Sequence, residues 1–145
     1  MLLSAEKTMK LLMFNVREFW YKTYMKTLKE IKDTEKEESI KDAIVVFANV
    51  ERDDQEQTAG TIRKAVKNIV WLARKTGRSR IVLHSFAHLS NSKSSVEFAA
   101  QVFEAIEDRL IRKGFEVSTT PFGYFLEFKI HVLGESLAKV WKALN

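Results

Sequence analysis

The side chains in this sequence that are best suited to proton transfer near neutral pH are its three histidines, His84, His88 and His131. His84 and His88 lie four residues apart in the stretch Ile81–Ser90, which begins as an apolar strand and runs out into a polar turn. We interpret His84 as a packed or hydrogen-bonded strand residue. His88 ends the strand and is the candidate catalytic residue, with a structural role as the alternative.

The pattern predicts neither a metal ion nor a cofactor. Zinc requires three or four convergent ligands, whereas His131 belongs to a different strand from the other two histidines and the chain has no cysteine. The sequence also lacks the G-x-G-x-x-G and P-loop motifs of dinucleotide and nucleoside-triphosphate sites. No Ser-His-Asp arrangement follows from the spacing of these residues.

A second stretch with functional character is Thr120–Ile130, in which a Pro-Phe-Gly turn leads into an aromatic-rich strand. Gly123 in that turn lets another group approach the backbone closely. We interpret Ile81–Ser90 and Thr120–Ile130 as two walls of one pocket, because strand ends that run into polar turns commonly carry sites. The aromatic stretch Phe19–Tyr24 is expected in the core or a dimer interface, with base stacking as the alternative.

Hydrophobic periodicity predicts the strands and helices that hold these two walls in position. The first two strands are expected to form a hairpin turned at Asn15-Val16-Arg17, followed at 26–42 by a charged, solvated segment that is either a mobile loop or a short exposed helix. A capping box of Ser94 and Glu97 is expected to start the second helix. Strands are expected at 10–14, 18–25, 43–50, from 81, at 115–118 and at 125–133, and helices at 57–76, from 94 to 114 and at 135–144. This order predicts an α+β domain with a mixed, mainly antiparallel β-sheet and about three helices.

Length and composition set the broad class of the protein. With 145 residues the chain is expected to form one domain over residues 9–145, behind an N-terminal extension of residues 1–8. The formal net charge of +5 is a modest bias toward a polyanionic partner such as nucleic acid, but on charge alone an ordinary solvated basic surface is the preferred interpretation. No apolar run approaches the roughly 20 residues of a membrane span. With no cysteine and no signal-peptide pattern, we expect a cytoplasmic protein without a membrane partner.

Three motifs together carry a resemblance to a known family. They are F-A-H-L-S at 86–90, P-F-G-Y at 121–124 followed by F-K-I at 128–130, and V-V-F-A-N-V-E at 45–51. The chain resembles the archaeal threonyl-tRNA synthetase editing domain over essentially residues 9–145. The resemblance implies a D-aminoacyl-tRNA deacylase-like fold, a homodimer, and removal of serine wrongly attached to threonine tRNA. The implied partners are the aminoacylated 3′ end of tRNA and a threonyl-tRNA synthetase catalytic chain.

The same resemblance implies a mechanism that relies on RNA. The 2′-hydroxyl of the terminal adenosine and a bound water would do the chemistry, while main-chain groups of Val50 and Ala87 hold the substrate and His88 takes the family's histidine position. Preorganised backbone dipoles are physically suited to stabilise charge that develops on an ester carbonyl. The remaining positions carried over as substrate-binding are Phe122, Gly123, Tyr124, Phe125, Leu126, Asn15 and Lys139.

Several of these positions depart from the family pattern. Leu126 stands where the family has a lysine, Lys139 where it has a glutamate, and Asn15 begins a segment that usually reads like His-Ser-Asp. Whether the chain is an active ester hydrolase therefore stays open. The alternatives are an aminoacyl-tRNA deacylase whose chemistry depends on backbone and RNA, with the family's or an altered amino-acid preference, a diverged non-catalytic paralogue that binds tRNA or a synthetase, and a structural or dimerisation domain.

Overall fold

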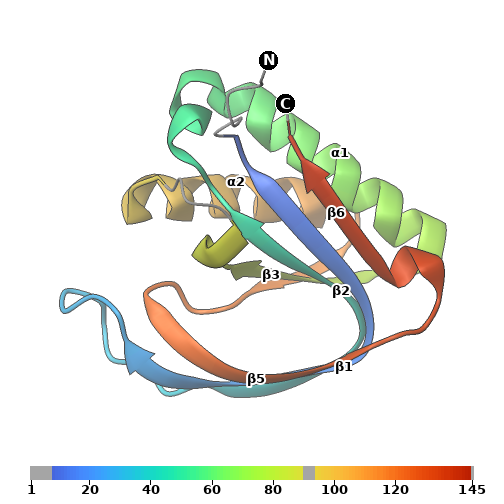
Figure 1. Ribbon diagram of the computed structural model, residues 1–145, viewed down its shortest axis with the longest axis horizontal. Coiled ribbons are helices and arrows are strands. Elements are labelled where there is room, and N and C mark those ends of the chain that lie inside the picture. Colours follow the sequence, from blue (N-terminus) through green and yellow to red (C-terminus); the bar gives the residue numbers. More distant parts are fainter. Residues whose placement is uncertain (1–7, 90–93, 145) are drawn as a thin grey trace.

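A single long strand, β1 (Lys10–Lys26), lies at the centre of a six-stranded mixed sheet in the computed structural model, which describes residues 8–89 and 94–144 (Figure 1). On one side, β1 pairs antiparallel with β2 (Glu37–Asn49). On its other side, the first half of β1 pairs with β6 (Lys139–Ala143) and the second half with β5 (Tyr124–Val132). The sheet continues from β2 through two parallel strands, β3 (Arg80–Ser85) and β4 (Glu116–Thr119).

Two α-helices, α1 (Thr58–Thr76) and α2 (Val96–Arg112), form a layer on one face of the upper part of the sheet (Figure 1). Each is the crossover between two parallel strands, which need such a long connection. Three short 3₁₀ turns complete the described chain: η1 (Arg52–Gln57), η2 (Ala87–Leu89) and η3 (Ser136–Ala138). The α+β class with a mixed sheet is thus confirmed, but the described residues contain two α-helices rather than about three.

The helix layer and the sheet enclose the larger of two apolar clusters. Alternating residues of the strands face the helices, as expected for a period of two. Each helix is followed by a glycine with a left-handed φ. The N–H of Gly77, at φ 73°, bonds to the carbonyls of Ala73 and Arg74 at the end of α1. Gly114, at φ 98°, follows the last turn of α2. Fully buried members of the cluster include Leu11, Met13, Ile44, Ile69, Leu72, Ile81, Ile106 and Leu110.

A strong bend of β1 and β2 creates the second cluster. Both strands curve so that their lower halves, with β5, fold beneath the upper sheet (Figure 1). The bend coincides with an irregularity between Val16 and Glu18, opposite Asp42, whose φ of 53° is left-handed. The curled sheet encloses a second set of buried side chains on the face away from the helices, namely Val16, Phe19, Tyr21, Ala43, Val45, Phe47 and Val82.

The predicted hairpin turn at Asn15-Val16-Arg17 is wrong, because these residues continue one unbroken strand. Asn15 and Val16 are 2% and 0% exposed, which a turn of a surface hairpin would not be. The segment contains neither Gly nor Pro to punctuate it. The strand β2 likewise begins at Glu37, inside the predicted charged segment, where Tyr21 donates its hydroxyl to Glu38 across the strand pair.

The predicted last helix at 135–144 is also wrong, since this segment forms η3 and then strand β6. The spacing of Leu137, Val140 and Leu144 fits a helical face, yet Val140 and Leu144 share one face of a strand equally well. The first half of β1 offers an unpaired edge, and pairing with it satisfies the backbone groups of β6. In so short a segment this pairing outweighs helix propensity.

The capping box predicted at Ser94 and Glu97 is wrong by one residue. Ser95 is the N-cap of α2, and its hydroxyl accepts a hydrogen bond from the N–H of Phe98 at 3.2 Å. The N–H of Ser94 instead donates to the carbonyl of Val50 at 3.0 Å, which ties the start of α2 to the end of β2. The expected extension at 1–8, apart from Thr8, and Ser90 in the first predicted wall lie outside the described residues.

Candidate active-site cavity

A cavity of about 650 Å³ opens where the carboxyl ends of β2 and β3 meet the start of α2 and the turn that precedes β5. The ends of neighbouring parallel strands reach the same edge of a sheet, so both polar turns arrive there together. This arrangement confirms that the two predicted walls enclose one pocket. Its lining includes seven of the positions carried over from sequence: Val50, Ala87, Phe122, Gly123, Tyr124, Phe125 and Leu126.

Backbone hydrogen bonds hold these walls in register. The N–H of Phe86 donates to the carbonyl of Ala48 at 2.8 Å, and the N–H of Thr120 donates to the carbonyl of Leu83 at 3.0 Å. The carbonyl of Val50 accepts the N–H of Ser94 and keeps a second lone pair. The cavity is therefore framed by main-chain groups whose positions are set by the sheet and by the first turn of α2.

The wall before β5 is fixed by a loop that sequence reasoning did not connect with the site. Gly123 has a φ of 79°, and a Cβ atom at this position would lie 2.7 Å from Cγ1 of Ile31. The carbonyl of Gly123 accepts the N–H of Thr27 at 2.7 Å, and the hydroxyl of Tyr124 donates to the carbonyl of Lys32 at 2.7 Å. The charged loop after β1 thus packs on the turn, and it brings Thr27 and Leu28 into the cavity lining.

His84 forms part of the cavity lining and is buried, with an exposed fraction of 6%. Its Nδ1 lies 2.9 Å from the hydroxyl oxygen of Thr120, and its ring packs edge-on against Phe47 with 4.8 Å between centroids. Burial lowers the pKa of His84 to about 4, so the ring is neutral at pH 7. The interpretation of His84 as a packed, hydrogen-bonded strand residue is confirmed, but its place in the cavity wall was missed.

This buried histidine predicts a specific dependence of stability on pH. The folded-state pKa lies below the unfolded value of 6.5, so the unfolded chain binds a proton first as the pH falls. The free energy of unfolding should therefore drop by about 1.4 kcal/mol per pH unit from pH 6.5 toward pH 4, or about 3 kcal/mol in all. Chemical denaturation across this range should show the loss in the wild type and a flatter profile in His84→Gln.

Two comparisons make that measurement specific to His84. The exposed His131 on β5 provides the control variant His131→Gln, which should keep the wild-type profile. Burial raises the pKa of Asp54, an effect that adds stability as the pH falls and so opposes the histidine term. The difference between His84→Gln and wild type cancels the Asp54 term, and an equal slope in both would contradict the prediction.

The other predicted site residues lie in different surroundings. His88 belongs to η2, next to Ala87, while its side chain lies outside the described part of the chain. Asn15 is buried between Glu135 and Arg78, donating to the first at 3.0 Å and accepting from the second at 2.7 Å. Lys139 is exposed on β6, with Nζ 3.5 Å from the carbonyl of Leu133. The described lining of the cavity includes neither Asn15 nor Lys139.

Leu126 and its neighbours alternate between the two faces of β5, as the residues of a strand do. Leu126 is half-buried and packs against the second cluster, as do Ile130 and Val132. Glu127 and Lys129 are exposed on the opposite face of β5. The position where the resemblance expects a lysine is therefore an apolar part of the cavity wall.

The described residues place further limits on the chemistry. Among them, no group of three or more His, Cys, Asp and Glu side chains is arranged to hold a metal ion. Neither of the two α-helices described is both long and apolar enough to cross a membrane. The lining is mainly apolar, and its polar side chains are those of Thr27, Asn49, His84, Ser85, Ser94, Ser95 and Tyr124. Such a surface is suited to hold an uncharged or weakly polar group through backbone contacts.

Comparison with known proteins gives this geometry a context. Residues 9–144 match the family described as the archaea-specific editing domain of threonyl-tRNA synthetase. The chain is 33% identical over 138 residues to a threonine–tRNA ligase of Hyperthermus butylicus, covering 91% of this chain and 22% of that protein. It is 33% identical over 120 residues to a threonine–tRNA ligase of Thermococcus kodakarensis, covering 83% and 19%. The chain thus spans about a fifth of the length of these relatives.

A solved structure supports the fold. The c-Myc DNA unwinding element binding protein superposes with a TM-score of 0.65 at 13% sequence identity, covering 92% of this chain and 97% of that one. At such low identity the likeness concerns the fold alone. The expected D-aminoacyl-tRNA deacylase-like α+β fold class is confirmed.

Proposed function

Because this chain belongs to the archaea-specific editing domain family of threonyl-tRNA synthetase, we propose that it edits aminoacyl-tRNA by hydrolysing the ester of mischarged tRNA, with Ser-tRNA(Thr) as substrate. The observation that carries the proposal is the cavity of about 650 Å³ at the strand ends. This volume lies in the range of sites for small ligands. It is large enough for an aminoacylated terminal adenosine.

In the proposed complex, the aminoacyl group contacts the main chain of Val50 and Ala87, and the Phe122–Leu126 wall encloses the adenosine. Aromatic rings such as Phe86 and Phe122 provide surfaces on which an unpaired base can stack. Burial lowers the pKa of His84 to about 4, which makes its ring a weak base, and its Nδ1 is engaged by Thr120. We therefore assign activation of the attacking water to the terminal 2′-hydroxyl, with His88 as a further catalytic candidate beside Ala87.

The direct test is release of labelled serine from Ser-tRNA(Thr), with Thr-tRNA(Thr) and several other aminoacyl-tRNAs in parallel. Hydrolysis of the serine ester well above the buffer rate, with Thr-tRNA(Thr) spared, is expected. Hydrolysis of a different ester alone would show that the pocket selects another amino acid. Binding of tRNA without hydrolysis of any ester would rule out the deacylase and leave the second candidate.

That second candidate is a diverged paralogue that binds the tRNA end or a synthetase without hydrolysis. The observation favouring it is the loss of charged groups in the wall: Leu126 replaces the expected lysine, and Lys139 lies on β6 outside the described lining. We rank it second because the proposed mechanism uses main-chain groups and RNA, which these substitutions leave in place.

A Leu126→Lys variant separates the two candidates. If main chain and RNA provide catalysis, the added ammonium should change the single-turnover rate of serine release by less than about tenfold, since it takes no part in that mechanism and a flexible lysine that reaches water contributes about 1 kcal/mol. If the missing lysine explains an inactive protein, hydrolysis should appear only in the variant. Glu127→Lys adds a lysine on the opposite face of the same strand and is the matched control.

We also propose that the domain works as a homodimer in the cytoplasm, alongside a threonyl-tRNA synthetase catalytic chain. Large apolar side chains are exposed where the end of β1 pairs with the start of β5: Tyr24 is 73%, Met25 53% and Phe125 54% exposed, and Met25 lies opposite Phe125 in register. An exposed apolar group of this kind favours association. Sedimentation equilibrium over a range of protein concentrations tests this, and a monomer at all concentrations would contradict it.

A further inference from the structure

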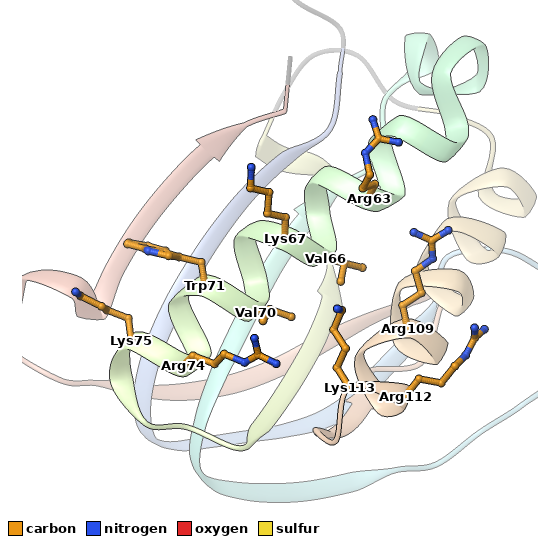
Figure 2. Close-up of a pocket in the computed structure, with 10 residues that line it drawn as sticks. All are labelled: Arg63, Val66, Lys67, Val70, Trp71, Arg74, Lys75, Arg109, Arg112 and Lys113. Atoms are coloured by element: carbon orange, nitrogen blue, oxygen red, sulfur yellow. The ribbon is translucent and has the colours of Figure 1, made fainter.

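A second hollow, of about 980 Å³, lies on the outer side of the helix layer, between α1 and the C-terminal part of α2 (Figure 2). We call it the helix groove. Its floor is apolar, because Val66 and Val70 are 4% and 8% exposed. Arg74 from α1 and Lys113 from α2 point toward the same space between the helices (Figure 2). The rim carries Trp71 and seven exposed cations, namely Arg63, Lys67, Arg74, Lys75, Arg109, Arg112 and Lys113.

The helix groove gathers cations that have no ion-pair partner among the described residues. Within the described residues, none of its seven cations makes an ion pair; the five ion pairs found there involve Lys10, Lys26, Lys36, Arg78 and Arg80. The groove holds seven of the chain's 24 basic residues, so the other 17 are outnumbered by its 19 acidic residues. Seven cations therefore gather at this one groove, while the rest of the chain carries a formal net charge of −2.

Helix stability alone does not account for this arrangement. On α2 the three cations lie in or just after the last turn, where the helix dipole favours them. On α1, however, basic residues follow the whole length of the helix, and the helix contains no acidic residue. Arg63 and Lys67 are four residues apart, a like-charge spacing that costs a few tenths of a kcal/mol. A stability cost without internal compensation indicates a functional surface.

The dimensions of the helix groove fit a nucleic-acid backbone. Arg63 and Lys75 are twelve residues apart on α1, which is about 18 Å of helix and matches about five phosphates of one duplex strand. The helix α2 connects the groove to the cavity, because Ala99 lines the cavity and Arg109 lines the groove. These two residues are ten positions apart, or about 15 Å along the helix axis.

We propose that the helix groove binds the phosphate backbone of the tRNA acceptor stem, while the aminoacylated end enters the cavity. This inference rests on the proposed function, since it identifies where the body of the same RNA is held. Trp71 is 45% exposed, and Nζ of Lys142 lies 5.9 Å from its ring centroid. Its ring offers a surface against which a ribose can pack beside the phosphate contacts.

The test uses an uncharged acceptor-stem minihelix of tRNA(Thr) and its salt-dependent binding to the protein. A triple variant, Arg74→Gln, Arg109→Gln and Lys113→Gln, removes cations from both helices. The matched control, Arg17→Gln, Lys22→Gln and Lys41→Gln, removes three exposed cations from β1 and β2 and so has the same net charge. We expect the groove variant to bind at least about tenfold more weakly, with a salt slope reduced by about 2 to 3, and the control to bind like the wild type.

Hydrolysis provides a separate readout. A seryl ester on a short CCA-ended oligonucleotide lacks the stem, so the groove variant should hydrolyse it at the wild-type rate. If no ester is hydrolysed but minihelix binding still depends on the groove, the proposed function is wrong, whereas the assignment of the helix groove as an RNA-binding surface is supported. Equal minihelix binding by the groove variant and the control would overturn the inference. This result is expected if the groove instead binds an acidic protein. Absence of minihelix binding by the wild type at low salt would overturn it as well.

Discussion

Ser-tRNA(Thr) whose terminal adenosine carries hydrogen in place of the 2′-hydroxyl is expected to be hydrolysed at least about 10²-fold more slowly than the natural substrate, because general acid–base catalysis typically contributes 10²- to 10⁴-fold. The physical reason lies in the cavity. Burial lowers the pKa of His84 to about 4, so its ring is a weak base toward a water molecule, and its Nδ1 is already engaged by Thr120. In the proposed mechanism the RNA hydroxyl takes that task.

Single-turnover rates at saturating protein measure the chemical step and exclude an effect on binding. Binding of the 2′-deoxy tRNA should be close to that of natural tRNA, since one hydroxyl among many contacts is changed. Equal hydrolysis of both substrates would show that a protein group activates the water. In that case His88→Ala should lose activity, because His88 lies beside Ala87 in η2.

The sequence predicted the position of the cavity correctly but did not predict all the residues that line it. The motifs that end β3 and precede β5 were expected to form two walls, and parallel strand ends place them together. Thr27 and Leu28 were missed because they reach the cavity only through the contact of their loop with Gly123 and Tyr124. That contact joins segments almost a hundred residues apart, and no local pattern encodes it.

The errors in the predicted fold have a common physical origin. Both the hairpin and the last helix were inferred from local periodicity, whereas β1 is long enough to pair with two different strands along its second side. A bent strand breaks the alternation of buried and exposed residues, so one element resembles two. The sequence of β6 fits either a helix or a strand. It forms a strand because the free edge of β1 is available for pairing.

The burial of charged residues was the least predictable property, as the acidic stretch after β2 shows. In this stretch Asp54 and Glu51 are both fully buried. Glu51 pairs with Lys10 at 2.9 Å, which links the end of β2 to the start of β1. Nothing in the local sequence distinguishes these two carboxylates from the exposed Glu56, since only the tertiary fold supplies their partners.

Replacing Asp54 with alanine is expected to lower the free energy of unfolding by about 3 to 5 kcal/mol, because a buried N–H left without an acceptor costs about 1 to 3 kcal/mol. The carboxylate of Asp54 accepts hydrogen bonds from the N–H of Met9 at 3.1 Å, the N–H of Glu51 at 2.8 Å and the hydroxyl of Thr61 at 3.1 Å. Two main-chain donors would lose their acceptor. Glu51 follows Val50 directly, so the cavity wall should loosen as well.

Equilibrium denaturation in urea measures this loss, and Glu56→Ala, an exposed acidic residue of the same turn, should change the free energy by no more than about 0.5 kcal/mol. If Asp54→Ala does not fold, Asp54→Asn keeps one acceptor oxygen and should lose a smaller part of the stability. In Asp54→Asn, serine release should fall by more than the unfolded fraction explains, because the main chain of Val50 is held through Glu51. A variant with wild-type stability would show that water replaces the carboxylate, and unchanged hydrolysis would show that Val50 is positioned by β2 and Ser94 alone.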